Sequence, residues 1–127
     1  MSNIIYPVET RNARLQLNVT NAGADAQILL VNGTRPLNGG ALTGGNTILA
    51  ELVAGATFAT VTGGVLTANA ITRDNEGNAD GTPTFARILT SADGWVADID
   101  LSGFPAIVTG QPVEISALTI TDANYDA

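Results

Sequence analysis

The chain has 127 residues, of which 45% are hydrophobic and only 5% aromatic, and its formal net charge is −7. It contains five arginines but no lysine, histidine or cysteine. These absences exclude imidazole-based triads, thiolate nucleophiles and metal ligands, lysine Schiff bases and disulfides, and they argue against an enzyme. The acidic charge argues against nucleic acid and anionic membrane as partners, because both are bound through basic surfaces.

The length fits one domain with a hydrophobic core of its own. We expect this domain to span residues 13–121, between an N-terminal arm (1–12) and a C-terminal tail (122–127). The two ends lack strand periodicity, so we expect them to be disordered or ordered only against a neighbour. No stretch reaches the roughly 18 apolar residues of a membrane span, and the N-terminus lacks the pattern of a secretory signal.

Most segments, taken in chain order, have the pattern of short β-strands. Leu15, Leu17 and Val19 alternate with polar residues, which predicts a half-buried strand. Residues 26–31 form a continuous apolar run of strand length, and a loop rich in glycine and asparagine follows up to about residue 46. Residues 47–53 fit a strand or a short helix, and we favour a strand because the segment is short and Gly55 follows it.

Hairpin signals follow in the second half of the chain. The pair Gly63-Gly64 separates apolar segments 57–62 and 65–72, and Asp93-Gly94 separates segments 82–89 and 95–101. With a last segment at 112–121, the chain has seven to nine short strands and no convincing helix. We therefore predict an all-β, antiparallel β-sandwich of jelly-roll-like type. The predicted core residues share the inward positions of the alternation: Leu15, Leu17, Val19, Leu29, Phe58, Val65, Ile71, Phe85, Ile88, Trp95 and Ile99.

The most polar loop is the candidate cation site. It places Asp74, Glu76, Asn78 and Asp80 at alternate positions, and their oxygens suit a hard cation such as calcium. The loop departs from an EF-hand, because alanine stands at its sixth position, phenylalanine at its twelfth, and no helices flank it. A solvated loop tip explains the same pattern, so we predict no bound metal and no other cofactor.

Three further features admit two interpretations each. Asp98 and Asp100 could be a carboxylate pair of the glycosidase kind, or two solvent-facing residues of one strand. Trp95 could stack on a sugar, but the alternation places it on the core face with Ile99, and we favour the core. Arg35 could pair with an acid of its own chain or reach a partner, and the sequence leaves both open.

Several short motifs follow one another along residues 12–121: NGTRP at 32–36, LAEL at 49–52, FA at 58–59, GGVLTANAI at 63–71, GT at 81–82 leading to FARI at 85–88, and SALTIT at 116–121. In these motifs the chain resembles small β-proteins from the structural modules of tailed bacteriophages, either head decoration (cement) proteins or head-fibre and tail-associated components. The family pattern carries no catalytic residues, so the resemblance implies a non-enzymatic virion protein. The short chain, which shows no fibrous extension, favours decoration over a fibre.

The resemblance implies synthesis in the host cytoplasm, assembly on the capsid exterior, the major capsid protein as partner, and a homotrimer. Residues expected to contact these partners lie in the two ends and the first loop: Ile4, Ile5, Tyr6, Arg35 and Tyr125. The alternative is a carbohydrate- or receptor-binding β-sandwich on a head fibre or tail, which an exposed aromatic patch would favour.

Overall fold

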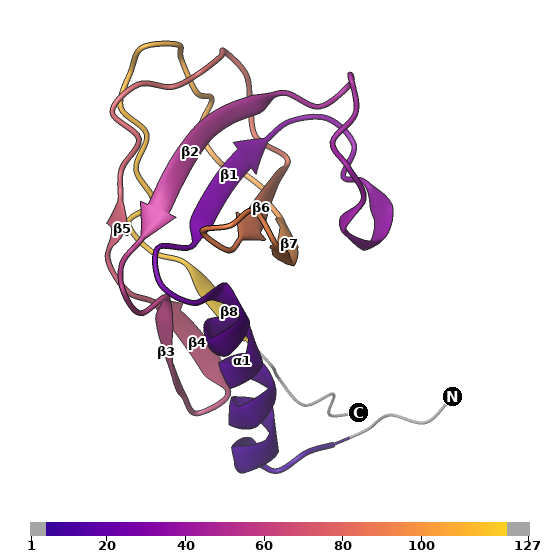
Figure 1. Ribbon diagram of the computed structural model, residues 1–127, viewed down its shortest axis with the longest axis vertical. Coiled ribbons are helices and arrows are strands. Elements are labelled where there is room, and N and C mark those ends of the chain that lie inside the picture. Colours follow the sequence, from indigo (N-terminus) through magenta and orange to yellow (C-terminus); the bar gives the residue numbers. More distant parts are fainter. Residues whose placement is uncertain (1–4, 122–127) are drawn as a thin grey trace.

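The protein consists mostly of β-strands, joined by long irregular segments (Figure 1). The structure is a computed structural model that describes residues 5–121. Its elements in chain order are α1 (Val8–Ala22), β1 (Gln27–Val31), the 3₁₀ turn η1 (Leu37–Gly39), β2 (Ile48–Ala54), β3 (Ala59–Thr62), β4 (Val65–Ala68), β5 (Ile71–Thr72), β6 (Phe85–Leu89), β7 (Trp95–Asp100) and β8 (Thr119–Thr121).

The strands form two antiparallel sheets, one in the order β5-β2-β1-β6-β7 and the other in the order β3-β4-β8. The predicted all-β, sandwich-like class is therefore confirmed, whereas jelly-roll connectivity stays a prediction. The strand preferred for residues 47–53 is present as β2.

The strand predicted at residues 15–19 is wrong, because these residues belong to α1. The helix contains no glycine or proline, carries Glu9 in its first turn, and ends at Gly23, whose φ of 68° suits a helix C-terminus. Leu15, Val19 and Ala22 form its buried stripe, at the spacing of one helix face. The boundary expected after residue 12 falls inside this helix, and the ends 1–4 and 122–127 lie outside the described residues.

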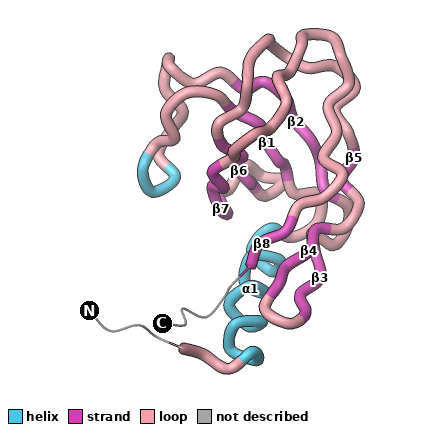
Figure 2. Tube along the Cα trace, turned by 180° about the vertical axis from the view of Figure 1, so that it is seen from behind, coloured by secondary structure: helices cyan, strands magenta, loops and turns pink. Residues whose placement is uncertain are grey.

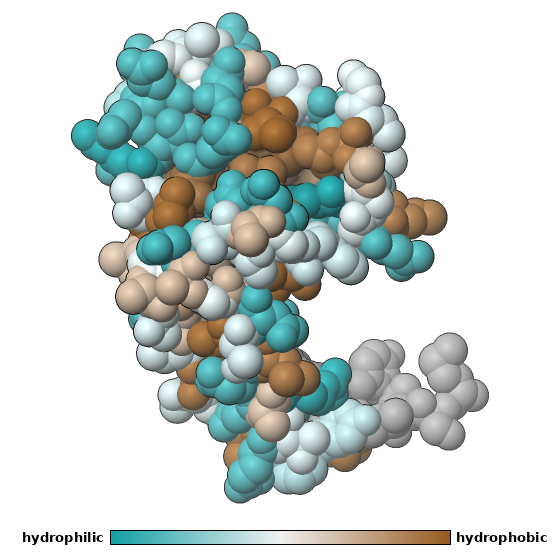
Figure 3. Space-filling model, in the orientation of Figure 1, coloured by the Kyte–Doolittle hydropathy of each residue, from teal (hydrophilic) through white to brown (hydrophobic). Residues whose placement is uncertain are grey.

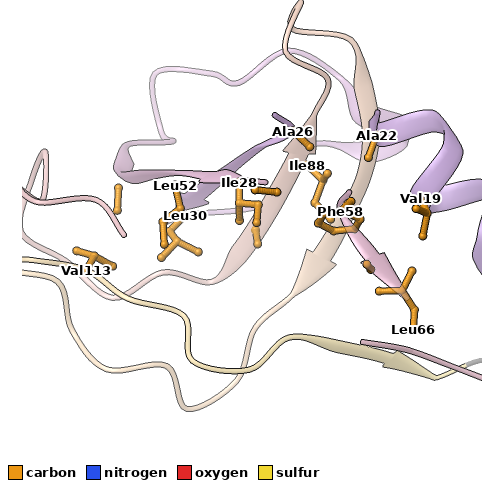
Figure 4. Close-up of a cluster of buried hydrophobic side chains, with 14 of the residues drawn as sticks. Val19, Ala22, Ala26, Ile28, Leu30, Leu52, Phe58, Leu66, Ile88 and Val113 are labelled. Carbon is orange, nitrogen blue, oxygen red and sulfur yellow. The ribbon is translucent and has the colours of Figure 1, made fainter. Parts of the chain in front are cut away.

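One apolar cluster connects both sheets and the helix (Figure 4). In the five-stranded sheet, Ile28 pairs across the ladders with Leu52 on one side and Ile88 on the other. Phe58 and Leu66 continue the cluster into the three-stranded sheet, against which α1 packs. The irregular segment that contains Ile107 and Val113 covers this face of the five-stranded sheet.

The opposite face of the five-stranded sheet is also covered. Leu29, Val31 and Phe85 lie there and pack against Leu42, which belongs to the loop between β1 and β2. The sheet is therefore buried on both faces, which explains why β1 reads as a continuous apolar run and not as an alternation.

Trp95 was predicted to be a core residue, and this prediction is wrong. The ladder between β6 and β7 shifts at the start of β7: Ile88 pairs with Ala97 and Leu89 with Trp95, which leaves Val96 as an extra residue. A bulge of this kind reverses the side on which the preceding side chain emerges. Val96 packs against the core, and Trp95 is 49% exposed on the other side.

The other predicted core residues fall into three groups. Six are buried: Leu15, Val19, Leu29, Phe58, Phe85 and Ile88. Three are partly buried: Val65, Ile71 and Ile99. Leu17 is 59% exposed, because a helix turns residues two positions apart toward different sides.

Two leucines of α1 provide a direct test of this helix. We expect Leu15→Ala to lower the free energy of unfolding by about 2–5 kcal/mol, since it leaves a cavity in the core. Leu17→Ala should change it by less than about 0.5 kcal/mol, because the side chain is exposed. Urea unfolding of both variants measures the difference. Equal losses would contradict the helix and favour a strand that buries both side chains.

Candidate functional site

A buried ion pair joins the last two strands of the five-stranded sheet. Arg87 and Asp98 are direct cross-strand partners, and two bonds connect them: Nε to Oδ1 at 2.9 Å and Nη2 to Oδ2 at 3.0 Å. Their side chains are only 7% and 4% exposed. The third arm of the guanidinium, Nη1, donates to the Gly40 carbonyl at 2.8 Å. Buried charges are tolerated when hydrogen bonds satisfy them in this way.

The same carboxylate positions the only tryptophan. The indole Nε1 of Trp95 donates to Oδ1 of Asp98 at 3.2 Å. Gly39 lies against one face of the ring so closely that a Cβ at this position would stand 2.2 Å from indole Cδ2. The exposed half of Trp95 is therefore its opposite face and its edge. The ring has a fixed orientation and an accessible side.

The loop of residues 33–46, called the Leu37 loop below, lies beside this tryptophan and projects from the domain (Figure 1). Its base is closed by the Asn46 side-chain amide, which donates to the carbonyls of Asn32 and Thr34. Its tip displays Leu37, which is 80% exposed. The next residue, Asn38, has a φ of 53°, a left-handed conformation that asparagine tolerates better than most residues.

Arg35 ties the Leu37 loop to β7. Its Nε lies 2.7 Å from Oδ1 of Asp100; the Asp100 side chain is largely exposed, whereas that of Arg35 is 37% exposed. This hydrogen bond and the charge of Asp100 raise the pKa of Arg35 above its ordinary value. Of the two possibilities left open for Arg35, the structure shows the pair within the chain. Asp98 and Asp100 thus lie on one strand face but serve two different arginines.

We expect the two aspartates to differ sharply on substitution. Asp98→Ala leaves the Arg87 charge buried without its partner and should lower the free energy of unfolding by about 3–5 kcal/mol. Asp100→Ala removes an exposed pair on the same face and should have little effect. Chemical unfolding gives the stabilities, and Trp95 fluorescence anisotropy should fall only in Asp98→Ala. Similar behaviour of the two variants would show that the Arg87–Asp98 pair has no special role.

The candidate cation loop uses its carboxylates to hold other segments in place. Asp74 accepts hydrogen bonds from the backbone amides of Glu51 at 2.8 Å and Glu76 at 3.1 Å. Asp80 accepts from the amide and the hydroxyl of Thr109, at 2.7 and 2.9 Å. Glu76 and Asn78 are exposed.

Among residues 5–121, no group of three or more acidic, histidine or cysteine side chains is arranged to hold a metal ion. The absence of a bound metal at this loop stays a prediction.

The hydrogen bonds from Thr109 lower the pKa of Asp80 below its ordinary value of 3.8. A carboxyl group whose pKa is depressed by folding stabilises the native state above its unfolded pKa, and this contribution disappears as the pH falls through the folded pKa. We therefore expect Asp80→Asn to be less stable than the parent chain at pH 7, with a difference that shrinks below pH 3.8. Thr109→Val, which keeps the backbone donor, should show an intermediate pH dependence. Urea unfolding as a function of pH measures it, and a difference that stays constant contradicts the role of Asp80.

The residues expected to contact partners do not form one site. Ile5 is exposed just before α1, and the Tyr6 ring lies 4.8 Å from the guanidinium carbon of Arg14. Arg35 lies in the Leu37 loop, on the five-stranded sheet. Ile4 and Tyr125 lie outside the described residues. The sequence interpretation missed Leu37, although a lone leucine between Pro36 and an Asn-Gly-Gly turn is a recognisable signal of a displayed side chain.

A cleft of ≈ 430 Å³ lies along the irregular segment between β7 and β8, called the 104–117 cleft below. Most of its lining side chains are apolar: Phe104, Pro105, Ile107, Val108, Val113 and Ile115. Ile107 and Val113 reach from the cleft into the core, whereas Val108 is exposed. Neither the cleft nor its lining was foreseen from the sequence, because it arises from two stretches that turn back on each other.

Comparison with protein-family models, with curated proteins and with solved structures found no match. Among the described residues, no helix has the length and apolar character needed to cross a membrane.

Proposed function

We propose that this protein is a non-enzymatic structural protein of a virion, a decoration (cement) protein that binds the outside of the capsid. The observation that carries the proposal is that two large apolar side chains are exposed at α1, Ile5 just before the helix and Leu17 on it. Burying such a side chain against a partner removes apolar surface from water and stabilises the complex. The resemblance to phage structural proteins supports the capsid, and its major protein, as that partner.

The composition fits this role. The net charge of −7 keeps the free chain soluble and disfavours adsorption to the DNA of the particle. Hydrogen bonds donated by Asn46 and accepted by Asp74 and Asp80 hold the long loops in place, so the loops provide a rigid surface for docking. A homotrimer whose ends pack on a neighbour remains part of the proposal, since linked copies attach more strongly than single ones.

The second candidate function is a carbohydrate- or receptor-binding module, and the exposed face of Trp95 favours it. An aromatic ring of fixed orientation is a suitable platform for stacking on a sugar ring. Trp95 is the only tryptophan, so its emission would report saccharide binding directly. A saturable change of this emission with saccharide would favour the module over the capsid.

The capsid proposal is tested on α1 with two substitutions that add the same charge. Leu17→Asp should reduce binding to capsids of the encoding phage that lack the protein by at least about tenfold in Kd. Gln16→Asp, one position away on the same helix and also exposed, should bind nearly as the parent chain does. Co-sedimentation measures binding, and thermal unfolding verifies that both variants are folded.

Two results contradict the proposal. One is equal binding of Leu17→Asp and the parent chain. The other is a protein that is present in purified virions in only a few copies, because a decoration protein occurs in a fixed ratio to the major capsid protein.

A further inference from the structure

We propose that copies of this protein associate head to tail, with Leu37 of one copy inserted into the 104–117 cleft of the next copy. The occupant of the cleft is thus a second copy of this chain. The contact goes beyond capsid attachment and does not depend on it, because it involves neither Ile5 nor Leu17.

The first observation is the way in which Leu37 is displayed. It is the most exposed of the large hydrophobic residues described, and Figure 3 shows an apolar projection on the side where the Leu37 loop extends. The loop behind it is held by the Arg87 bond to Gly40, by the Arg35–Asp100 pair and by the packing of Gly39 on Trp95. Such preorganisation lowers the entropy lost on binding. An apolar side chain held out rigidly has the properties of an interface anchor.

The second observation is the cleft itself. Its volume of ≈ 430 Å³ lies in the range of ligand-binding pockets. Its apolar side chains, which share the lining with nearly as much polar surface, match the chemistry of a leucine flanked by a proline. Its polar lining residues, Gln111, Glu114 and Ser116, offer hydrogen-bonding groups beside the apolar side chains. The cleft therefore suits a loop tip, which brings an apolar side chain together with exposed peptide groups.

Charge favours this pairing of surfaces over others. In a chain with twelve acidic residues and five arginines, most surfaces of two copies repel each other. The Leu37 loop has one charged residue, Arg35, and the segment 102–118 also has one, Glu114. Glu114 is paired with Arg73 only at 3.4 Å and remains exposed. The two surfaces are thus nearly uncharged, and the single charge of each is paired within its own chain, so little like-charge repulsion opposes their contact.

The third observation is that the two surfaces lie on opposite sides of the molecule. The Leu37 loop covers one face of the five-stranded sheet and the 104–117 segment covers the other. Figure 1 shows the loop with η1 on one side and the orange-to-yellow segment between β7 and β8 on the other, and in Figure 2 the η1 loop again projects away from the body of the molecule. A copy cannot fill its own cleft, and a two-fold dimer is not required. Contacts between two different surfaces give closed rings or filaments.

The test separates the two surfaces with one substitution in each. Leu37→Asp destroys the projection and keeps the cleft, whereas Val108→Asp places a charge in the cleft and keeps the projection. The matched controls are Ala41→Asp, exposed in the same loop, and Val53→Asp, an exposed valine outside the cleft. Sedimentation velocity of the full-length chain over a range of concentrations measures association, and circular dichroism verifies folding.

We expect the parent chain and both controls to form larger species as concentration rises. Leu37→Asp and Val108→Asp should each weaken association by at least about tenfold in Kd. An equimolar mixture of these two variants should form a one-to-one dimer and nothing larger, because only one intact projection and one intact cleft can then meet. This mixing result also protects the test against a variant that is merely damaged, since a damaged chain would not pair.

Three outcomes overturn the proposal. The first is a parent chain that stays monomeric at the highest soluble concentration. The second is a mixture of the two variants that stays monomeric or forms species as large as those of the parent chain. The third is a small apolar molecule that native mass spectrometry finds bound to the purified parent chain and to Leu37→Asp but not to Val108→Asp. Such a result would show that the cleft binds a ligand and not a second copy. None of these outcomes bears on Leu17, so the capsid proposal is judged separately.

Discussion

The ion pair between Arg87 and Asp98 holds together one whole side of this protein. It connects β6 to β7, orients Trp95 through the indole Nε1, and fixes the Leu37 loop through the Gly40 carbonyl. Both charges are buried, so each bond that the guanidinium and the carboxylate make offsets part of their desolvation. A displacement of the loop or the ring would leave one of these groups unsatisfied. The orientation of Trp95 and the position of the Leu37 loop therefore depend on a buried electrostatic arrangement.

The second constraint is that irregular segments cover the five-stranded sheet on both faces. Backbone groups in such segments form only isolated bridges with one another, such as those between residues 74–81 and 107–113, and they need further partners when they are buried. Side chains of Asn32, Asn46, Asp74 and Asp80 supply them. Polar residues of these types are typical of mobile loops. Here their hydrogen bonds hold the covering segments in place on the sheet. The result is a small domain with long but ordered loops.

This construction leaves apolar side chains exposed in separate places. Ile5 and Leu17 lie at α1, whereas Leu37 and the 104–117 cleft lie on the two faces of the five-stranded sheet. We propose that the first surface meets the capsid and that the others meet neighbouring copies. A protein that binds a repetitive shell in many copies needs both kinds of contact, and separate surfaces allow both to form at once.

The sequence by itself determined the β-rich class, the hairpin turns and most of the core, because strand alternation and glycine turns are local properties. The continuous apolar run of β1 and the segments at β2, β3, β4, β6 and β7 follow from neighbouring residues alone. Tertiary structure decided the rest. Leu15, Leu17 and Val19 fit a strand and a helix equally well, and only packing on the three-stranded sheet selects the helix that buries Leu15 and Val19. Trp95 left the core because one bulge at Val96, in the hairpin of β6 and β7, reversed its side. A bulge inserts one residue into the alternation from which the core face is predicted, and the alternation itself does not reveal where it lies.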